Sequence, residues 1–180
     1  MLSRLRVGGL VVVVTSAEHG SGQGNHLPPP GCPPGTRLTR AGWQDALKIG
    51  VGLRKQRVFV ELAQAGPGCA ARHTAYLVFG ADRVRHDPGL AASCDADGAE
   101  RQARRSVLAA RLAERPPYPG VNLALVVDAC NLHDLARPTW PECAREPGDG
   151  GLVLFDPAAP TRVLGCLTTE VLRAFSERPE

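Results

Sequence analysis

Asp128 and Cys130 are the residues whose types and position most clearly could do chemistry. They follow residues 121–127, an apolar run whose length and composition predict a strand buried on both faces. Open α/β sheets bind ligands beyond the carboxyl ends of their strands, so Cys130 occupies a position suited to a functional thiol. A thiolate there could act as a nucleophile. The alternative is that Cys130 is a small buried side chain, because free cysteine is among the most buried residue types.

Hydrophobic periodicity predicts strands that alternate with helices along the chain. The strands are expected at residues 10–14, 58–62, 74–79, 121–127 and 151–155. Three helices are expected where apolar residues recur at helical spacing. Each follows a polar residue that could cap its first turn: Thr39 for the first, Asp97 for the second, and Thr168 or Thr169 for the third. This order predicts βαβ units. We therefore expect a three-layer α/β fold with a mostly parallel central sheet and helices on both faces.

Length and composition indicate one globular domain over residues 1–180. The chain is 43% hydrophobic and 22% charged, which is ordinary for a folded domain. Its net charge is only +3, with basic and acidic residues interspersed, so we expect no nucleic-acid partner. No segment is long enough to cross a bilayer, so we expect no membrane partner. The oligomeric state is left open.

Residues 1–17 allow two interpretations. Arg4 and Arg6 precede a valine run and the small residues that end at Ala17, an order that fits a short secretory signal peptide. Four consecutive valines are also typical of a strand, and the apolar run is short for a signal core. The sequence favours the strand, and the signal peptide stays as the alternative.

The six cysteines also allow two interpretations. Their even number is typical of a disulfide framework, which would place the protein in a secreted or periplasmic compartment. Their wide spacing, in a chain long enough to build a core without crosslinks, favours a reduced cytoplasmic protein. Cys130, His133 and Cys143 could form three corners of a zinc site. No close pair of cysteines supports that site, so we predict no metal and no other cofactor.

Several short motifs, taken in order, resemble the caspase-like fold of bacterial caspase homologues and metacaspases. Asp128-Ala129-Cys130 resembles the Asp-x-Cys that carries the nucleophile in those families. Residues 43–47 resemble their Asp-Ala helix, and residues 165–172 are similar to their later Gly-x-Phe-Thr helix. The resemblance implies a caspase-like cysteine endopeptidase that acts on peptide or protein substrates. It also implies that Asp128 helps to form an acidic pocket for Arg or Lys.

The histidine of those families is not matched, because residues 79–82 are Phe-Gly-Ala-Asp where the families have Ser-Gly-His-Gly. His86, four residues further on, is the nearest substitute for the base. His133, three residues after Cys130, is the second candidate, whereas His19 is distant in sequence. A thiol without a base is a poor nucleophile, so the sequence favours a degenerate relative of the peptidases over an active one. The contrasting hypothesis is an exported, disulfide-bonded protein with a binding or structural role.

Overall fold

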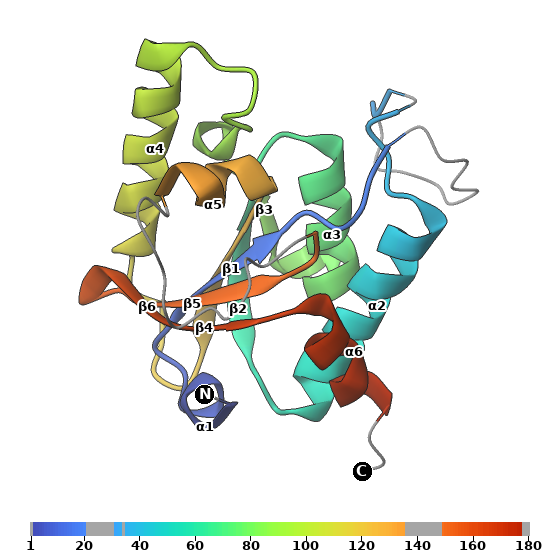
Figure 1. The fold of residues 1–180 in the computed structure, drawn as a ribbon. Coiled ribbons are helices and arrows are strands. Elements are labelled where there is room, and N and C mark those ends of the chain that lie inside the picture. Colours follow the sequence, from blue (N-terminus) through green and yellow to red (C-terminus); the bar gives the residue numbers. More distant parts are fainter. Residues whose placement is uncertain (1, 21–30, 34, 136–148, 178–180) are drawn as a thin grey trace.

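A six-stranded mixed sheet runs through the middle of the molecule, and helices cover both of its faces (Figure 1). The computed structural model describes residues 2–20, 31–33, 35–135 and 149–177. The strands lie in the order β3-β2-β4-β1-β5-β6. Their bounds are β1 Val11–Thr15, β2 Val60–Ala65, β3 Val84–His86, β4 Asn122–Val127, β5 Leu152–Asp156 and β6 Ala159–Leu167.

Five of the six strands run in the same direction, and only β5 runs the opposite way. The pairs β1 with β4, β4 with β2, and β2 with β3 are parallel, whereas β5 runs antiparallel to β1 and to β6. The expected α/β fold with helices on both faces is therefore confirmed, and the sheet is mixed. The run at residues 121–127 lies near the centre, as predicted, because β4 and β1 are the two middle strands.

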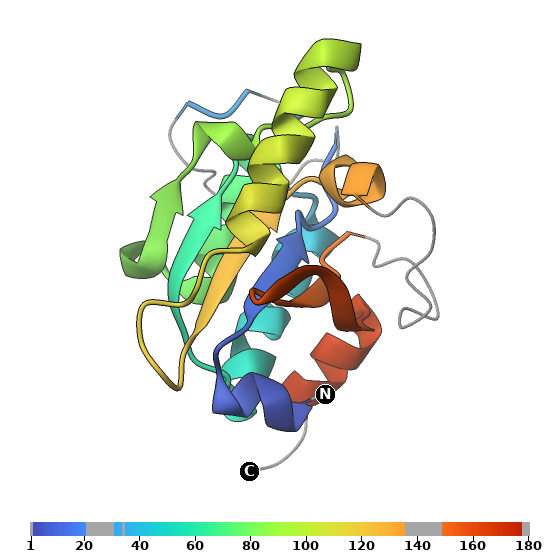
Figure 2. The same cartoon turned by 90° about the vertical axis from the view of Figure 1, so that its left-hand side faces the viewer.

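The helices divide into two layers (Figure 2). The first layer holds Leu5 of α1 together with α2, α3 and α6, and it packs on Val12 and Val14 of β1. The second layer holds α4 and α5, which pack on Val11 and Val13. The helix bounds are α1 Leu2–Val7, α2 Arg40–Lys55, α3 Cys69–Phe79, α4 Gly98–Leu112, α5 Ala129–Leu135 and α6 Thr169–Glu177, with short 3-10 turns at Ala81–Arg83 and Pro88–Leu90.

The helix starts follow the predicted capping residues. Thr39 accepts a hydrogen bond from the backbone N–H of Gly42 at the start of α2. Asp97 accepts one from the N–H of Glu100 at the start of α4. Helix α6 begins at Thr169, one of the two predicted positions. Side-chain caps thus mark the starts of α2 and α4.

The prediction of a strand at residues 74–79 is wrong, because these residues form the second half of α3. Their β-branched and aromatic side chains favour a strand by propensity. The buried residues Ala71, Ala75 and Val78 instead recur at helical spacing, and that period decided the outcome. Strands β3 and β6 were not predicted, and both lie at the edges of the sheet.

The N-terminal segment is part of the folded core. Strand β1 lies between β4 and β5, and Leu5 of α1 is fully buried. Removal of residues 1–17 as a signal peptide would take away a middle strand of the sheet. No helix in the described part of the chain is long and apolar enough to span a membrane.

Deleting residues 1–17 is expected to leave insoluble or unfolded protein. The buried valines at residues 11–14 each contribute about 1.5–3 kcal/mol, comparable in sum to the roughly 5–15 kcal/mol that stabilises a whole domain. Circular dichroism and thermal melting would measure the loss. The full-length Val7→Ser variant is the control and should melt like the wild type, because Val7 is 74% exposed. A soluble truncation that melts cooperatively would contradict the expectation.

Candidate functional site

The carboxyl ends of β1, β2 and β4 meet at one end of the sheet because the three strands are parallel and adjacent. The backbone N–H of Ser16, after β1, donates to the carbonyl of Val127 at 2.8 Å. The N–H of Gly66, after β2, donates to the carbonyl of Val126 at 3.0 Å. We call this region, residues 16–19, 66–69 and 128–131, the carboxyl-end crevice. It is the position at which sheets of this class bind ligands.

Ser16 and Asp128 form a hydrogen-bonded pair in the crevice. The Ser16 Oγ donates to Asp128 Oδ1 at 2.9 Å. Ser16 is fully buried and Asp128 is half-buried. A carboxylate is too weak a base to deprotonate an ordinary serine, and serine hydrolases place an imidazole between the two groups. The bond therefore holds the carboxylate in place and does not by itself create a nucleophile.

The carboxylate of Asp128 also lies at the start of α3. A Cβ atom on Gly68, which precedes that helix, would sit 3.3 Å from Asp128 Oδ2. Gly68 offers no side chain to cap the helix, so the unpaired N–H groups of its first turn are left to other acceptors. A negative charge at a helix N-terminus is stabilised by the helix dipole. Asp128 is thus an internal anion at the point where the strand ends converge.

The segment after β1 is held by neighbouring helices. The backbone N–H of Ala17 donates to the Oγ1 of Thr74 on α3 at 2.9 Å, and Thr74 is fully buried. The carbonyl of Glu18 accepts from the N–H of Thr39 at 3.0 Å, just before α2. Gly42 lies so close to the Glu18 carbonyl that a Cβ atom would overlap it. These contacts fix the course of the chain toward His19.

His19 is the imidazole nearest in sequence to the end of β1. Its Nδ1 lies 3.2 Å from the carbonyl oxygen of Ala17, close enough to donate a hydrogen bond in the tautomer protonated at Nδ1. That tautomer would leave the lone pair on Nε2. The side chain is exposed to solvent, three residues beyond Ser16.

Cys130 is bonded to Cys94 in a disulfide, so its sulfur carries no thiolate in this structure. The proposed role as a nucleophile does not agree with that bond. A second disulfide joins Cys32 to Cys69, and Cys166 is also disulfide-bonded. The expectation of a reduced chain is therefore wrong. Each of the first two disulfides ties a loop to the first turn of a helix that follows a parallel strand.

The two candidate bases lie apart from each other. His86 ends β3 and its Nε2 is 2.7 Å from the hydroxyl oxygen of Tyr76. Strand β2 lies between β3 and β4, so about 10 Å separates the backbone of β3 from that of β4. His133 is exposed on α5, one turn after Cys130. No group of three potential metal ligands comes together in the described residues, and Cys143 of the zinc alternative lies outside them.

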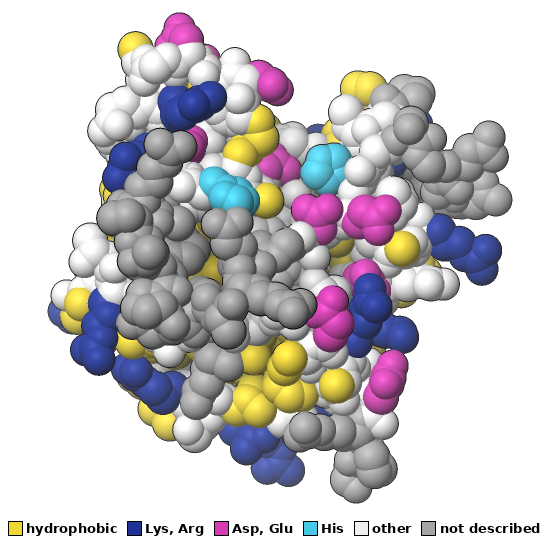
Figure 3. Space-filling view, viewed as in Figure 1, with side chains coloured by type: hydrophobic (Ala, Val, Ile, Leu, Met, Phe, Trp, Pro, Cys, Tyr) yellow, Lys and Arg dark blue, Asp and Glu magenta, His cyan; other side chains and the backbone are white. Residues whose placement is uncertain are grey.

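The crevice carries more negative than positive charge. The residues that follow the three strands include Glu18 and Asp128 but no lysine or arginine, and the first arginine of α3 is Arg72, one turn into the helix. Figure 3 shows acidic and histidine side chains gathered over the middle of this face. Away from the crevice, Arg111 of α4 donates to Glu114 and to Asp87, and these hydrogen bonds raise the pKa of the Arg111 guanidinium.

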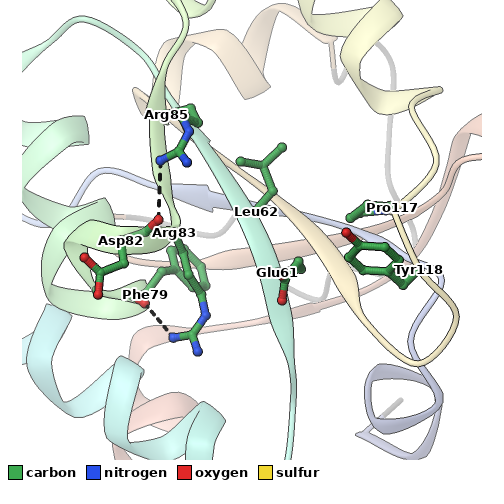
Figure 4. Close-up of a pocket in the computed structure, with 9 residues that line it drawn as sticks. Glu61, Leu62, Phe79, Asp82, Arg83, Arg85, Pro117 and Tyr118 are labelled. Carbon is green, nitrogen blue, oxygen red and sulfur yellow. Dashed lines mark hydrogen bonds between the residues drawn. The ribbon is translucent and has the colours of Figure 1, made fainter.

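A cavity of about 410 Å³ opens elsewhere, along the edge of β2. Figure 4 shows Arg83 and Arg85 on one side of β2 and Tyr118 on the other. The two guanidinium groups donate to the backbone carbonyls of Phe79 and Asp82, each at 3.3 Å. Its lining holds no serine, cysteine or histidine. The cavity therefore offers no nucleophile paired with a base.

Comparison with solved structures shows the fold. A histidine-to-alanine variant of Entamoeba histolytica phosphoserine phosphatase, bound to phosphoserine, has a TM-score of 0.58 at 15% identity, covering 91% of this chain and 98% of its own. SixA of Agrobacterium tumefaciens, assigned as a phosphohistidine phosphatase, has a TM-score of 0.55 at 15% identity, covering 89% and 98%. A mycobacterial glucosyl-3-phosphoglycerate phosphatase has a TM-score of 0.50 at 18% identity, covering 82% and 89%. No family model and no characterised protein sequence matches the chain.

These neighbours are phosphoglycerate mutase-like histidine phosphatases, so the fold is theirs and the resemblance to caspase-like proteins is wrong. Expectations of a cysteine endopeptidase, of peptide substrates and of an exported binding or structural protein fall with it. The role of Asp128 in a pocket for basic residues loses its basis. The motifs behind the resemblance were short, and buried strands that end in polar turns are common to many α/β folds.

The sequence analysis did not identify Ser16 as a site residue, nor did it predict that the carboxylate of Asp128 lies beside Gly68. Ser16 follows a strand that was correctly predicted, so its place at the carboxyl end was within reach. Its partner Asp128 was found, but no pattern in the sequence indicated that residues 112 positions apart would be bonded.

Thiol titration of denatured, unreduced protein is expected to find few or no free thiols. The physical reason is that cysteines in disulfides do not react with thiol reagents. A sample reduced before denaturation is the control and should give all six thiols. Six thiols without reduction would show that the crosslinks do not form.

Proposed function

We propose that this chain keeps the histidine-phosphatase fold without catalysing phosphoryl transfer. The observation that carries the proposal is the carboxylate of Asp128, bonded to Ser16 and placed beside the start of α3. The structural neighbours are phosphatases of small phosphorylated molecules by their names. Phosphoryl transfer requires positive groups that stabilise the charge on the transferred phosphate. The carboxyl-end crevice of this chain instead presents an anion.

The repulsion between Asp128 and a bound phosphate is larger than the attraction that the N-terminus of α3 can offer. Two like unit charges about 4 Å apart repel by roughly 4 kcal/mol at the effective dielectric constant near a protein surface. The N-terminus of α3 offers at most about 2 kcal/mol of attraction to an anion, and part of that is already spent on Asp128. The repulsion is therefore the larger effect. A phosphate dianion would bind more weakly still, because it carries a larger charge.

A second candidate function is phosphoryl transfer through His19. The contact between Nδ1 and the Ala17 carbonyl supports it, because Nε2 would then be free to attack phosphorus. The neighbouring Glu18 and the absence of basic residues in the crevice sequence count against it. The two candidates predict opposite results in one assay.

The disulfides also support folding in an oxidising compartment. Disulfides form and persist outside the reducing cytosol in most organisms. We therefore propose a secreted or periplasmic location over the cytoplasmic one expected from cysteine spacing.

Phosphatase assays are expected to show no turnover above the buffer blank. p-Nitrophenyl phosphate, phosphoserine and 3-phosphoglycerate would be tested with the wild type and with His19→Ala. The matched control is His86→Ala, which alters a histidine bonded to Tyr76 on the edge strand β3, separated from β1 by β2 and β4. Turnover by the wild type and by His86→Ala that disappears in His19→Ala would overturn the proposal and establish the second candidate.

Neutralising Asp128 is expected to let the crevice take up inorganic phosphate. Asp128→Asn preserves the shape of the side chain and removes the repulsion, so affinity for phosphate should rise about tenfold or more over the wild type. Isothermal titration calorimetry and the thermal shift with phosphate would measure it. Asp95→Asn removes an exposed carboxylate outside the crevice and is the control. Equal phosphate affinity in the wild type and Asp128→Asn would show that the carboxylate is not what excludes the anion.

A further inference from the structure

The end of the sheet opposite the crevice carries most of the exposed large apolar side chains. Val7, Phe59 and Tyr118 are 74%, 61% and 61% exposed, and among the described residues only Val171 on α6 joins them. Each of the three lies in a segment that leads into a parallel strand, namely β1, β2 and β4. Parallel adjacent strands begin at the same end of a sheet, so the three segments lie together. We call residues 4–9, 54–59 and 115–121 the amino-end face.

Hydrogen bonds and cavities join these segments into one surface. Buried Asn122 donates to the carbonyls of Leu5 and Phe59, at 2.9 and 3.0 Å, and so links the first two segments to β4. A cavity of about 250 Å³ is lined by Phe59, Arg83 and Val121 among others. The cavity of Figure 4 continues from Arg83 to Tyr118. Figure 2 shows α1 and the loop before β4 at the same lower end of the molecule.

The same face is strongly basic. Its cationic residues are Arg4, Arg6, Arg54, Lys55, Arg57 and Arg115. Arg6 donates to the carbonyl and side-chain oxygens of Gln56, and Arg54 donates to the carbonyl of Val78. These acceptors are neutral, so they leave the charge of both guanidinium groups uncompensated. Blue side chains are visible at the lower edge of Figure 3.

Within the part of the chain that the structure describes, few carboxylates lie close enough to offset this charge. Glu114 precedes the third segment, but it is ion-paired with Arg111 of α4. Asp156 lies across from Gly9 and Arg115, and Glu61 is one residue into β2. Asp82 lines the cavity of Figure 4, where Arg83 and Arg85 also lie. The balance over the face remains positive.

We propose that the amino-end face docks on an anionic lipid surface. Protruding apolar side chains among arginines and lysines are the combination that binds peripherally to such membranes, because the apolar tips enter the headgroup region while the cations meet lipid phosphates. Docking of this kind needs no membrane-spanning segment. The expectation of no membrane partner was based only on the absence of such a segment, so it does not apply to peripheral binding. The proposal does not depend on the proposed function.

An acidic protein or nucleic acid fits the face less well. Either would be held by the charges, but exposed apolar side chains on three separate segments give such a partner no continuous apolar groove. A lipid interface accepts separate apolar tips without requiring a matching shape. Removal of the apolar side chains should therefore weaken binding to a lipid surface and leave binding to an acidic macromolecule unchanged.

Vesicle co-sedimentation of the oxidised full chain tests the proposal. The protein is expected to bind vesicles of phosphatidylcholine with 30% phosphatidylglycerol at about 50 mM salt and not vesicles of pure phosphatidylcholine, with binding weakened at about 300 mM salt. Arg57→Glu with Arg115→Glu should reduce binding at least about twentyfold, since each lost contact contributes roughly a factor of five. Phe59→Ser with Tyr118→Ser should also reduce binding severalfold.

Two controls distinguish the effect of altering the amino-end face from the effects of net charge and of unfolding. Arg40→Glu with Arg105→Glu makes the same charge change, at the opposite end of α2 and on α4, and should retain binding. Melting temperatures would confirm that each variant is folded. The proposal is overturned by absent binding to anionic vesicles, by equal loss in the control pair, or by full binding in the Phe59/Tyr118 variant. Polyglutamate or duplex DNA that binds as tightly as the vesicles would assign the face to an acidic macromolecule instead.

Discussion

The parallel pairing of β1 with β4 is the constraint on which the rest of the structure depends. Every residue of both strands is buried, so each face of the pair must be covered by a helical layer, and each end must satisfy its own polar groups. At the amino end, the side chain of Asn122 does this by bonding to Leu5 and Phe59. At the carboxyl end, Ser16 bonds to Asp128. The disulfides Cys32–Cys69 and Cys94–Cys130 then join the surrounding loops to helices that follow β2 and β4.

A shared fold does not carry a shared reaction. The backbone matches solved histidine phosphatases over most of its length, yet identity is 15–18% and the strand ends hold a carboxylate bonded to a serine. Packing of apolar side chains can preserve a sheet and its helices through large sequence change, because it depends on volume and pattern. Phosphoryl transfer depends on a few charged groups at fixed places, and a single change of sign reverses the electrostatics. A sequence can therefore change enough to lose phosphoryl transfer and still keep the fold.

The two ends of the sheet differ in charge for a topological reason. Strands β1, β2 and β4 all run in one direction, so every segment leading into them lies at one end and every segment leaving them lies at the other. The leading segments carry arginines and exposed apolar side chains, whereas the leaving segments carry Glu18 and Asp128. An antiparallel arrangement would have mixed these residues at both ends. Parallel topology thus turns a pattern dispersed along the sequence into two opposed surfaces.

The sequence by itself determined the class of fold and much of its local structure. Periods of apolar residues located β1 and β4, and Thr39 and Asp97 set the starts of α2 and α4, because these features depend on neighbours in the chain. It misplaced residues 74–79, where β propensity conflicted with a helical burial period. Only the tertiary structure decided that Cys130 pairs with Cys94, that Ser16 meets Asp128 and that three basic segments form one face. Such contacts join residues that are distant in the chain, and their partners are selected by the order and direction of strands in the sheet, which local pattern does not encode.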